Sequence, residues 1–391
     1  MSHFKKKVVL ISPFFYPEPI STGKFNTDFV NSLKDKVQSI TVICSHPFYP
    51  EWKVKYSNKQ LEGVHIIRGG KHIYYFKNST LRRVVLELWY TLFVVYTFCR
   101  IRQKTDIVIP IFPPSLAFYT INFFVKKETK VIGLIHDLQE VYASKKKGII
   151  NKVIRFFINN IEGSALRGCD KLIFLSYEMR ETAEKYYKLN KGKLTVQYPF
   201  VTLNYANNTS DLNNLLPSNK RNIVYSGALG EKQSPKELYS FFNYASKKID
   251  NTLFHFFSSG HIFDQLKKMN KNEKILFHDL VPKKNIEELY KKSTIQIIPQ
   301  KAGTSKGSLP SKLPNILASG CSALVITDKN SELDMFFKKY DINTVVTSWE
   351  NEVLCTVLNN LLEKNQGSNI TIMNTAKKLF NIDSMVDEIL S

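Results

Sequence analysis

The segment Gly303–Gly320 reads GTSKGSLPSKLPNILASG and separates two short apolar runs, Thr294–Pro299 (TIQIIP) and Ser322–Thr327 (SALVIT). Both runs are rich enough in β-branched residues, and short enough, to be buried parallel strands. Parallel neighbours need a crossover, so a helix is expected between them, with Ser311 as its N-cap and Gly320 at its end. The stretch therefore predicts a strand, a helix and a second strand of one parallel sheet.

The start of this expected helix is a candidate anion site. Free first-turn amides and the positive end of the helix dipole favour a phosphate, and Lys306 and Lys312 add positive charge. Lys312 and Asn315 are three residues apart and share one helix face. An ordinary loop with solvated lysines fits the same segment equally well, so both interpretations stay open.

Composition limits the class of protein. The 391 residues are 43% hydrophobic and 13% aromatic, which is enough for the cores of two domains rather than one. Five cysteines without a CxxC pair or a zinc-like His cluster predict reduced thiols and a cytoplasmic protein. The N-terminal run VVLIS is too short for a signal sequence and is expected to form the first strand.

The net charge of +21 calls for an acidic partner. Nucleic acid, anionic lipid and a sugar nucleotide all qualify. The chain lacks RRM, zinc-finger and helix-turn-helix signatures, so nucleic acid is the weakest of the three and is not expected as a partner.

Short apolar runs alternate with amphipathic segments along the whole chain. This pattern predicts an α/β protein with two Rossmann-like, doubly wound domains in tandem. An Asn-, Ser- and Thr-rich stretch at 201–221 marks the linker. The domains are thus expected at 1–200 and 201–373, with a helix over 374–391 folding back on the first. Ligands bind beyond the carboxyl ends of such strands, so two domains facing each other would share a cleft.

The segment Leu81–Lys104, LRRVVLELWYTLFVVYTFCRIRQK, is apolar and aromatic between basic flanks. Its uninterrupted part is too short to span a bilayer, which takes about 20 apolar residues. A monotopic helix at an anionic membrane surface and a fully buried core helix both fit, and both stay open. On the membrane interpretation, the contacting residues are Arg82, Arg83, Trp89, Arg100 and Arg102.

Glycines and a lysine follow several expected strands. Gly23 follows the first strand, where it could let a diphosphate approach the backbone, although a simple turn is equally plausible. In the second domain, Ile223–Gln233 (IVYSGALGEKQ) contains Lys232, which could neutralise a diphosphate leaving group or be a solvated loop lysine. The glycines expected near this donor site are Gly227, Gly230 and Gly260.

His136 and Asp137 end the apolar strand VIGLIHD. A polar pair at a strand end needs partners, and a ligand is one way to supply them, with a core histidine as the alternative. The sequence has no Ser/His/Asp order, HExxH helix, Walker loop or paired-carboxylate spacing, so it does not support hydrolase or kinase chemistry.

Taken together, these motifs resemble the family 4 glycosyltransferases of the GT-B fold, in particular the bacterial branch with the colanic acid and L-fucosamine transferases. The resemblance covers nearly the whole chain. It rests on YPEPISTGKF, SHPFYPEW (45–52), FPPSLAF (112–118), IHDLQE (135–140), YSGALGEKQ (225–233) and LPSKLPNILASGC (309–321).

The resemblance implies that a sugar is transferred from a nucleotide donor with retention of configuration. It also implies that the reaction uses neither a divalent metal nor another cofactor. The donor is expected to be UDP-linked and to carry an N-acetylated hexosamine or a deoxyhexosamine. The acceptor is expected to be a lipid-linked saccharide of capsule, O-antigen or exopolysaccharide synthesis. The enzyme would then lie at the inner face of the cell membrane.

For the residues, the resemblance implies that Gly23 approaches the donor diphosphate and that His136 and Asp137 line the sugar and acceptor site. Lys232 would stabilise the leaving nucleotide. The remaining donor contacts, to the diphosphate and ribose, would come from Ser311, Lys312 and Asn315.

The chain departs from the wider family pattern. Ala228 stands where many members have an arginine, and Gly307 and Asn315 stand where they have paired glutamates. Two other hypotheses remain: a UDP-sugar 2-epimerase of the same fold, and a non-enzymatic basic membrane-binding protein. The basic aromatic helix argues against the first, and glycines and lysines recurring at strand ends argue against the second.

Overall fold

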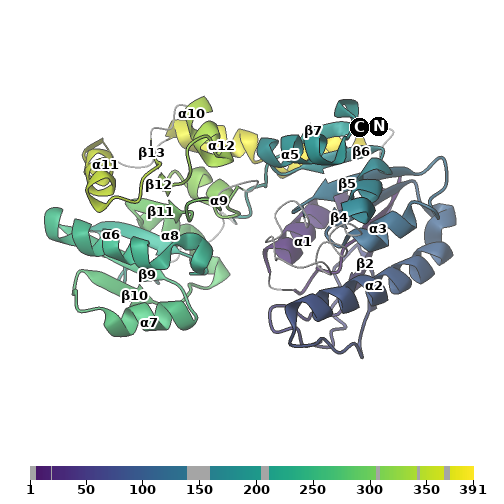
Figure 1. The fold of residues 1–391 in the computed structure, drawn as a ribbon, viewed down its shortest axis with the longest axis horizontal. Helices are drawn as coiled ribbons and strands as arrows, with labels where there is room; N and C mark the ends of the chain where they lie inside the picture. Colours follow the sequence, from purple (N-terminus) through teal and green to yellow (C-terminus); the bar gives the residue numbers. More distant parts are fainter. Residues whose placement is uncertain are drawn as a thin grey trace, which may run out of the picture. The chain divides into compact units, whose positions relative to one another are not determined.

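The computed structural model describes residues 6–18, 20–138, 159–203, 211–304, 309–340, 344–364 and 370–391. The chain divides into two compact units (Figure 1). The first contains Met1–Tyr198 together with Ile382–Ser391, and the second contains Pro199–Asn381.

The first unit is built on seven parallel strands in the order β3-β2-β1-β4-β5-β6-β7. The order reverses between β1 and β4, which makes this a doubly wound sheet with its switch point there. The strands are β1 (Lys7–Ile11), β2 (Ser39–Ser45), β3 (His65–Gly69), β4 (Ile107–Phe112), β5 (Lys130–Ile135), β6 (Lys171–Phe174) and β7 (Leu194–Val196).

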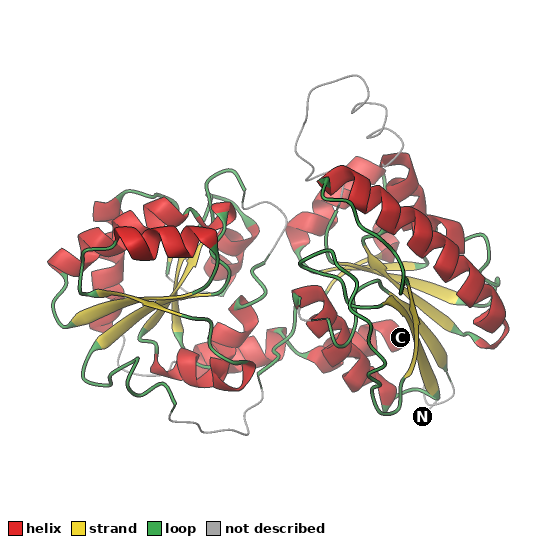
Figure 2. Cartoon of the chain, turned by 90° about the horizontal axis from the view of Figure 1, so that it is seen from below, coloured by secondary structure: helices red, strands yellow, loops and turns green. Residues whose placement is uncertain are grey.

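Helices cover both faces of this sheet, which explains why its strands are continuous apolar runs rather than alternating ones (Figure 2). Val9 and Ile11 belong to a core shared with Tyr90, Val94 and Phe118 of two helices on one face. The helices are α1 (Ser21–Lys34), α2 (Ser79–Ile101), α3 (Ser115–Ile121) and α5 (Tyr177–Tyr187), with single turns η2 (Arg102–Lys104) and η3 (Lys191–Lys193).

The C-terminal helix α13 (Ile382–Leu390) returns to the first unit and packs against α1. Its buried face carries Met385 and Val386. Three lysines of the first unit hold its polar side: Lys36 Nζ lies 2.8 Å from Asp383 Oδ1, Lys171 Nζ lies 2.6 Å from Glu388 Oε1, and Lys6 Nζ donates to the carbonyl oxygen of Leu390 (2.9 Å).

The structure differs from the sequence expectation for this C-terminal region. The expected single helix is two helices, and the first of them, α12 (Ile370–Leu379), belongs to the second unit and packs against α9 (Leu313–Ala318). Ala376 and Phe380 are buried there, and the Phe380 ring stacks on Phe336 with centroids 5.6 Å apart. The second unit therefore extends to residue 381 instead of 373.

The second unit repeats the doubly wound pattern with six parallel strands in the order β10-β9-β8-β11-β12-β13, and its switch point lies between β8 and β11. The strands are β8 (Arg221–Ser226), β9 (Thr252–Phe257), β10 (Ile275–His278), β11 (Ile295–Pro299), β12 (Ser322–Ile326) and β13 (Val345–Val346). The helices besides α9 and α12 are α6 (Pro235–Lys248), α7 (His261–Met269), α8 (Ile286–Lys292), α10 (Glu332–Lys339) and α11 (Asn351–Lys364), with single turns η4 (Glu231–Gln233) and η5 (Lys283–Asn285).

The two Rossmann-like sheets predicted from the sequence are thus confirmed. The strands on either side of Gly303–Gly320 are neighbours, with Ile295–Pro299 paired in parallel with Ser322–Ile326. The helix between them is shorter than expected, because α9 has only six residues and its N-cap is Lys312 rather than Ser311.

Candidate functional site

The predicted donor residues of the second unit all follow the carboxyl ends of its strands. This is the edge where ligands of doubly wound sheets bind. Gly227, Gly230 and Lys232 follow β8, Gly260 follows β9, and the segment with Ser311, Lys312 and Asn315 connects β11 to β12. The backbone N–H of Lys301, after β11, donates to the carbonyl oxygen of Lys232 (2.8 Å), which joins the loops after the two central strands.

Gly227 and Gly260 leave the backbone open at this edge. Their φ angles are 124° and 102°, which side chains rarely tolerate. A Cβ placed on either glycine would meet none of the described atoms within 4 Å. The two main-chain segments are therefore open to close approach by a ligand.

Lys232 has a fixed backbone and an exposed side chain. It lies in the single turn η4, which begins after Gly230 and ends at Ser234, a residue in the left-handed region with φ 46°. The Gly230 N–H donates to Gln233 Oε1 (3.0 Å), which closes the turn. Within the described parts of the chain, the Lys232 ammonium has no hydrogen-bond or ion-pair partner.

Lys312 does not project into the open loop as the sequence suggests. Its ammonium donates to the carbonyl oxygens of Ser226 (3.1 Å) and Ile297 (3.4 Å) and lies 4.5 Å from the Tyr225 ring centroid. The residue as a whole is half-buried, but its ammonium is enclosed, and burial lowers the pKa of Lys312 to about 7. This lysine binds the ends of two strands.

This arrangement removes groups that the sequence assigned to an anion site at the start of α9. The Leu313 amide is already bonded to the Pro310 carbonyl oxygen (2.9 Å), and Lys312 faces the strands. Ser311 is exposed and does not cap the helix. The other lysine invoked there, Lys306, lies outside the described residues.

The buried Lys312 gives a pH-dependent prediction. In the unfolded chain a lysine keeps its proton up to about pH 10.5, whereas the native side chain loses it near pH 7. Between pH 7 and pH 10.5 the unfolded state binds more protons than the native state. Lys312 therefore makes the free energy of unfolding rise with pH across this range, and this contribution is lost as pH falls toward 7. We expect Lys312→Met to remove that contribution, as measured by urea unfolding across this pH range. The exposed Lys236→Met is the control; equal pH slopes for wild type and Lys312→Met would show the ammonium to be solvated.

Asn315 is also engaged inside the second unit. Its Oδ1 accepts the backbone N–H of Thr202 (2.8 Å), and its Nδ2 donates to Thr202 Oγ1 (3.0 Å). The sequence predicted a ribose contact for this side chain. The structure places both of its polar atoms on the segment where the chain enters the second unit.

In the first unit, His136 and Asp137 lie at the carboxyl end of β5, as the sequence predicted. The His136 ring packs edge-on against Phe25 of α1, with centroids 4.5 Å apart. Its Nε2 is buried and has no hydrogen-bond partner among the described residues. Burial lowers the pKa of His136 to about 3, so the imidazole is neutral at physiological pH and suits a hydroxyl better than a phosphate. Asp137 is exposed, and its Oδ1 accepts the Leu138 N–H (2.9 Å).

Gly23 lies inside the first turn of α1, because that helix begins at Ser21. A Cβ at Gly23 would come within 2.9 Å of the Glu18 carbonyl oxygen and 3.0 Å of the Glu18 Cβ. The glycine is thus explained by packing of the loop after β1. Its predicted role beside a diphosphate stays a prediction.

Sequence reasoning missed Glu18. Its side chain is buried, and its two carboxylate oxygens accept the backbone N–H groups of Phe48 (3.1 Å) and Tyr49 (2.8 Å). Burial is the main reason why the pKa of Glu18 is raised to about 7. The signal was present in the sequence as an acidic residue between prolines in an aromatic loop, YPEP.

Glu18 holds a loop rich in aromatic residues, residues 46–56, which we call the aromatic loop. Phe48 stacks on Tyr75 (centroids 4.8 Å apart), and Trp52 packs against both. Tyr49 and Tyr56 keep 38% and 64% of their surface exposed. The loop thus has a packed base and exposed aromatic rings at the carboxyl end of β2.

Helix α2 combines the two alternatives that the sequence left open. One side is buried through Leu86, Tyr90, Thr91, Val94, Thr97 and Phe98. The opposite side exposes an apolar stripe, which consists of Leu81, Val84, Leu88, Leu92 and Tyr96. The described segment Ser79–Lys104 is long and apolar enough to cross a membrane by length and composition alone. Its Glu87 carboxylate, however, accepts the backbone N–H groups of Ser115 (3.3 Å) and Leu116 (3.1 Å), so the helix is part of the folded unit.

The predicted membrane residues of α2 separate into two groups. Arg83 and Arg100 are exposed, and the Arg100 guanidinium lies 4.1 Å from the ring centroid of Tyr96 in the apolar stripe. The other three make contacts within the first unit: Arg82 lies 4.5 Å from the Trp52 ring centroid, Trp89 Nε1 donates to Tyr75 Oη (2.9 Å), and Arg102 donates to the Phe124 carbonyl oxygen (3.3 Å).

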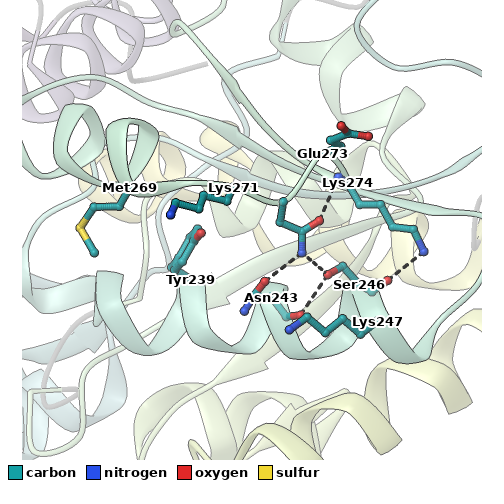
Figure 3. Close-up of a pocket in the computed structure, with 9 residues that line it drawn as sticks. Tyr239, Asn243, Ser246, Lys247, Met269, Lys271, Glu273 and Lys274 are labelled. Atoms are coloured by element: carbon teal, nitrogen blue, oxygen red, sulfur yellow. Dashed lines mark hydrogen bonds between the residues drawn. The ribbon is translucent and has the colours of Figure 1, made fainter.

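A groove of about 620 Å³ lies in the second unit, away from all these residues (Figure 3). It is lined by the last half of α6 and by residues 269–274, which lead into β10. Asn272 Nδ2 donates to Asn243 Oδ1 (2.9 Å) and Ser246 Oγ (2.8 Å) across it. Since α6 ends and β10 begins here, the groove is at the amino-terminal edge of the sheet, opposite the predicted donor residues.

Comparison with known proteins places this geometry among glycosyltransferases. No family model matches the chain. It is 26% identical over 356 residues, 84% of either chain, to WcaI of Escherichia coli K12, a protein provisionally described as a colanic acid biosynthesis glycosyl transferase. It has the GT-B fold. The resemblance predicted from the sequence is confirmed, and the comparisons support glycosyltransferase activity in general terms.

Several solved structures match this chain along nearly its full length at low sequence identity. Sucrose-phosphate synthase of Thermosynechococcus elongatus aligns with a TM-score of 0.73 at 12% identity, covering 98% of this chain and 97% of that one. WaaG, a lipopolysaccharide glycosyltransferase, aligns at 0.68 and 11% identity, covering 98% and 99%. Anabaena HepE in complex with UDP aligns at 0.65 and 12% identity, covering 98% of both chains.

Proposed function

We propose that this protein is a retaining glycosyltransferase that moves a sugar from a UDP-linked donor to a lipid-linked saccharide during surface polysaccharide synthesis. The observation that carries the proposal is the open carboxyl edge of the second sheet, where Gly227 and Gly260 leave the backbone accessible and the Lys232 ammonium has no partner among the described residues. The UDP complex of HepE, which shares the fold, supports a uridine nucleotide as the donor group.

In the proposed reaction, Lys232 balances the negative charge that develops on the leaving diphosphate, without a divalent metal. A nucleoside diphosphate is a good leaving group once this charge is balanced, so no protein acid has to protonate it. The exposed main chain at Gly227 and Gly260 allows the diphosphate to approach. In the first unit, the neutral His136 Nε2 has hydrogen-bonding capacity for a hydroxyl group of a saccharide.

We assign the acceptor saccharide to the aromatic loop of the first unit. Exposed rings such as Tyr49 offer apolar faces to a sugar. Lys71 lies 4.9 Å from the Tyr56 ring centroid, and Arg82 lies over Trp52, which adds positive charge for an acceptor that bears phosphate. The apolar stripe of α2 with Arg83 and Arg100 would hold the first unit on the cytoplasmic face of an anionic membrane.

Nucleotide binding tests the proposal. We expect UDP to raise the thermal unfolding temperature, because a ligand present at 100 times its Kd stabilises the native state by about 2.7 kcal/mol. We expect UMP to give less protection, since it lacks the second phosphate. Absence of protection by UDP and by a panel of UDP-sugars would support a non-enzymatic membrane-binding protein instead. Turnover of a UDP-sugar without acceptor would favour an epimerase.

A further inference from the structure

The six-residue helix α9 connects two parts of the second unit that are far apart in sequence. Its N-cap residue, Lys312, binds the ends of β8 and β11. One turn later, Asn315 binds Thr202 through both of its polar atoms. Both residues were expected to contact the nucleotide, and both instead have protein partners.

Lys312 contacts β8 and β11 just beyond the residues that pair these two strands. The register of β8 and β11 pairs Ile295 with Ile223 and Gln296 with Val224, and the chains continue beyond it to Ser226 and Pro299. Strand carbonyls without a ladder partner need another donor. The ammonium supplies this donor to Ser226 and Ile297, at the switch point itself.

Asn315 meets the chain where it enters the second unit, at residues 199–203. The same segment is bonded to the point where the chain leaves the unit, because the Val201 N–H donates to the Phe380 carbonyl oxygen (2.9 Å). We call residues 199–203 and 380–381 the two crossing segments. The buried Phe380 side chain and the packing of α12 on α9 fix this region further.

We infer that Asn315 is a positioning residue: through α9, it and Lys312 hold the two crossing segments and the strand ends at the donor edge in one rigid arrangement. The inference rests on the proposed function for its catalytic consequence. In the proposed reaction the leaving diphosphate lies at that edge, where misplacement of the reacting groups by about 1 Å can cost about a hundredfold in rate.

Asn315→Ala tests this role against direct nucleotide contact. We expect transfer to a bacterial membrane lipid extract to fall ten- to a hundredfold in kcat, while the Kd for UDP, measured by calorimetry, stays within twofold of wild type. A ribose ligand would behave in the opposite way, with the Kd for UDP raised about tenfold.

Thr202 supplies the matched variants, because it lies on the crossing segment and not at the donor edge. Thr202→Val removes only the bond to Asn315 Nδ2 and should lower kcat in the same direction by a smaller factor, whereas Thr202→Ser restores the hydroxyl and should restore kcat. Normal turnover in Thr202→Val together with weakened UDP binding in Asn315→Ala would overturn the inference.

Hydrogen exchange gives a readout that needs no activity. In Asn315→Ala, the amides of Val201 and Thr202 should exchange faster together, and Lys312→Met should accelerate the same amides through α9. Exchange unchanged by Lys312→Met would show that the two ends of α9 are independent. Failure of the proposed function would look different, since the wild-type protein would then show neither UDP binding nor transfer, while the exchange result would still decide the coupling.

Discussion

Lys232→Ala is expected to lower sugar transfer by about three orders of magnitude with little effect on folding. The ammonium is exposed and unpaired among the described residues, while the turn that carries it is fixed by the Gly230–Gln233 and Lys301–Lys232 hydrogen bonds. Two unit charges about 4 Å apart at an effective dielectric of about 20 interact by roughly 4 kcal/mol. If that interaction develops mainly as the diphosphate leaves, it corresponds to about a thousandfold in kcat.

Lys236→Ala is the matched control for this prediction. It removes the same charge from an exposed position four residues later, at the start of α6. We expect near-normal turnover and an unchanged unfolding temperature for this variant. Comparable loss in both variants would mean that the overall positive field matters rather than Lys232, and normal turnover in Lys232→Ala would exclude its role with the leaving group.

The fold was predictable from the sequence because most of the buried parallel strands are short apolar runs followed by glycine or a polar residue. Thr294–Pro299 and Ser322–Thr327 illustrate this, since both were recognised and are neighbours in the sheet. The two-residue strand Val345–Val346 was missed, because two residues give no periodicity. The boundary at 381 was missed because α12 and α13 are both helical by pattern, and only packing shows that they belong to different units.

For the candidate site residues, the place in the fold was predictable from the sequence, but the direction of the side chains was not. Sequence places Lys312 and Asn315 at the correct edge of the sheet, but a lysine beside a glycine-rich loop has the same local pattern whether it faces phosphate or strand carbonyls. Its direction depends on Ser226 and Ile297, which are distant in sequence. Glu18 was missed for the same reason, since its partners are backbone amides of another loop.

Leu88→Glu combined with Leu92→Glu is expected to weaken binding to anionic vesicles by about a hundredfold or more. These leucines are 54% and 74% exposed at the centre of the α2 stripe, so they contribute little to the folded core. Burying an exposed leucine side chain in lipid is worth about 1.5–3 kcal/mol, and two partly exposed ones together give about 3 kcal/mol, or about a hundredfold in affinity. The added carboxylates also repel anionic lipid. Vesicle co-sedimentation measures the loss, and thermal unfolding should show an unchanged fold.

The control and the alternatives for α2 follow from its two sides. Leu280→Glu with Met269→Glu makes the same kind of change at exposed positions of the second unit and should leave vesicle binding intact. Wild-type binding should weaken with salt, because Arg83 and Arg100 act through a screened field, and should be weaker on neutral vesicles. Equal binding to neutral and anionic vesicles would show that electrostatic attraction by Arg83 and Arg100 does not contribute to membrane binding. Resistance to alkaline carbonate extraction would instead mean that α2 inserts, and insertion would break the Glu87 bonds to Ser115 and Leu116 that join it to the first unit.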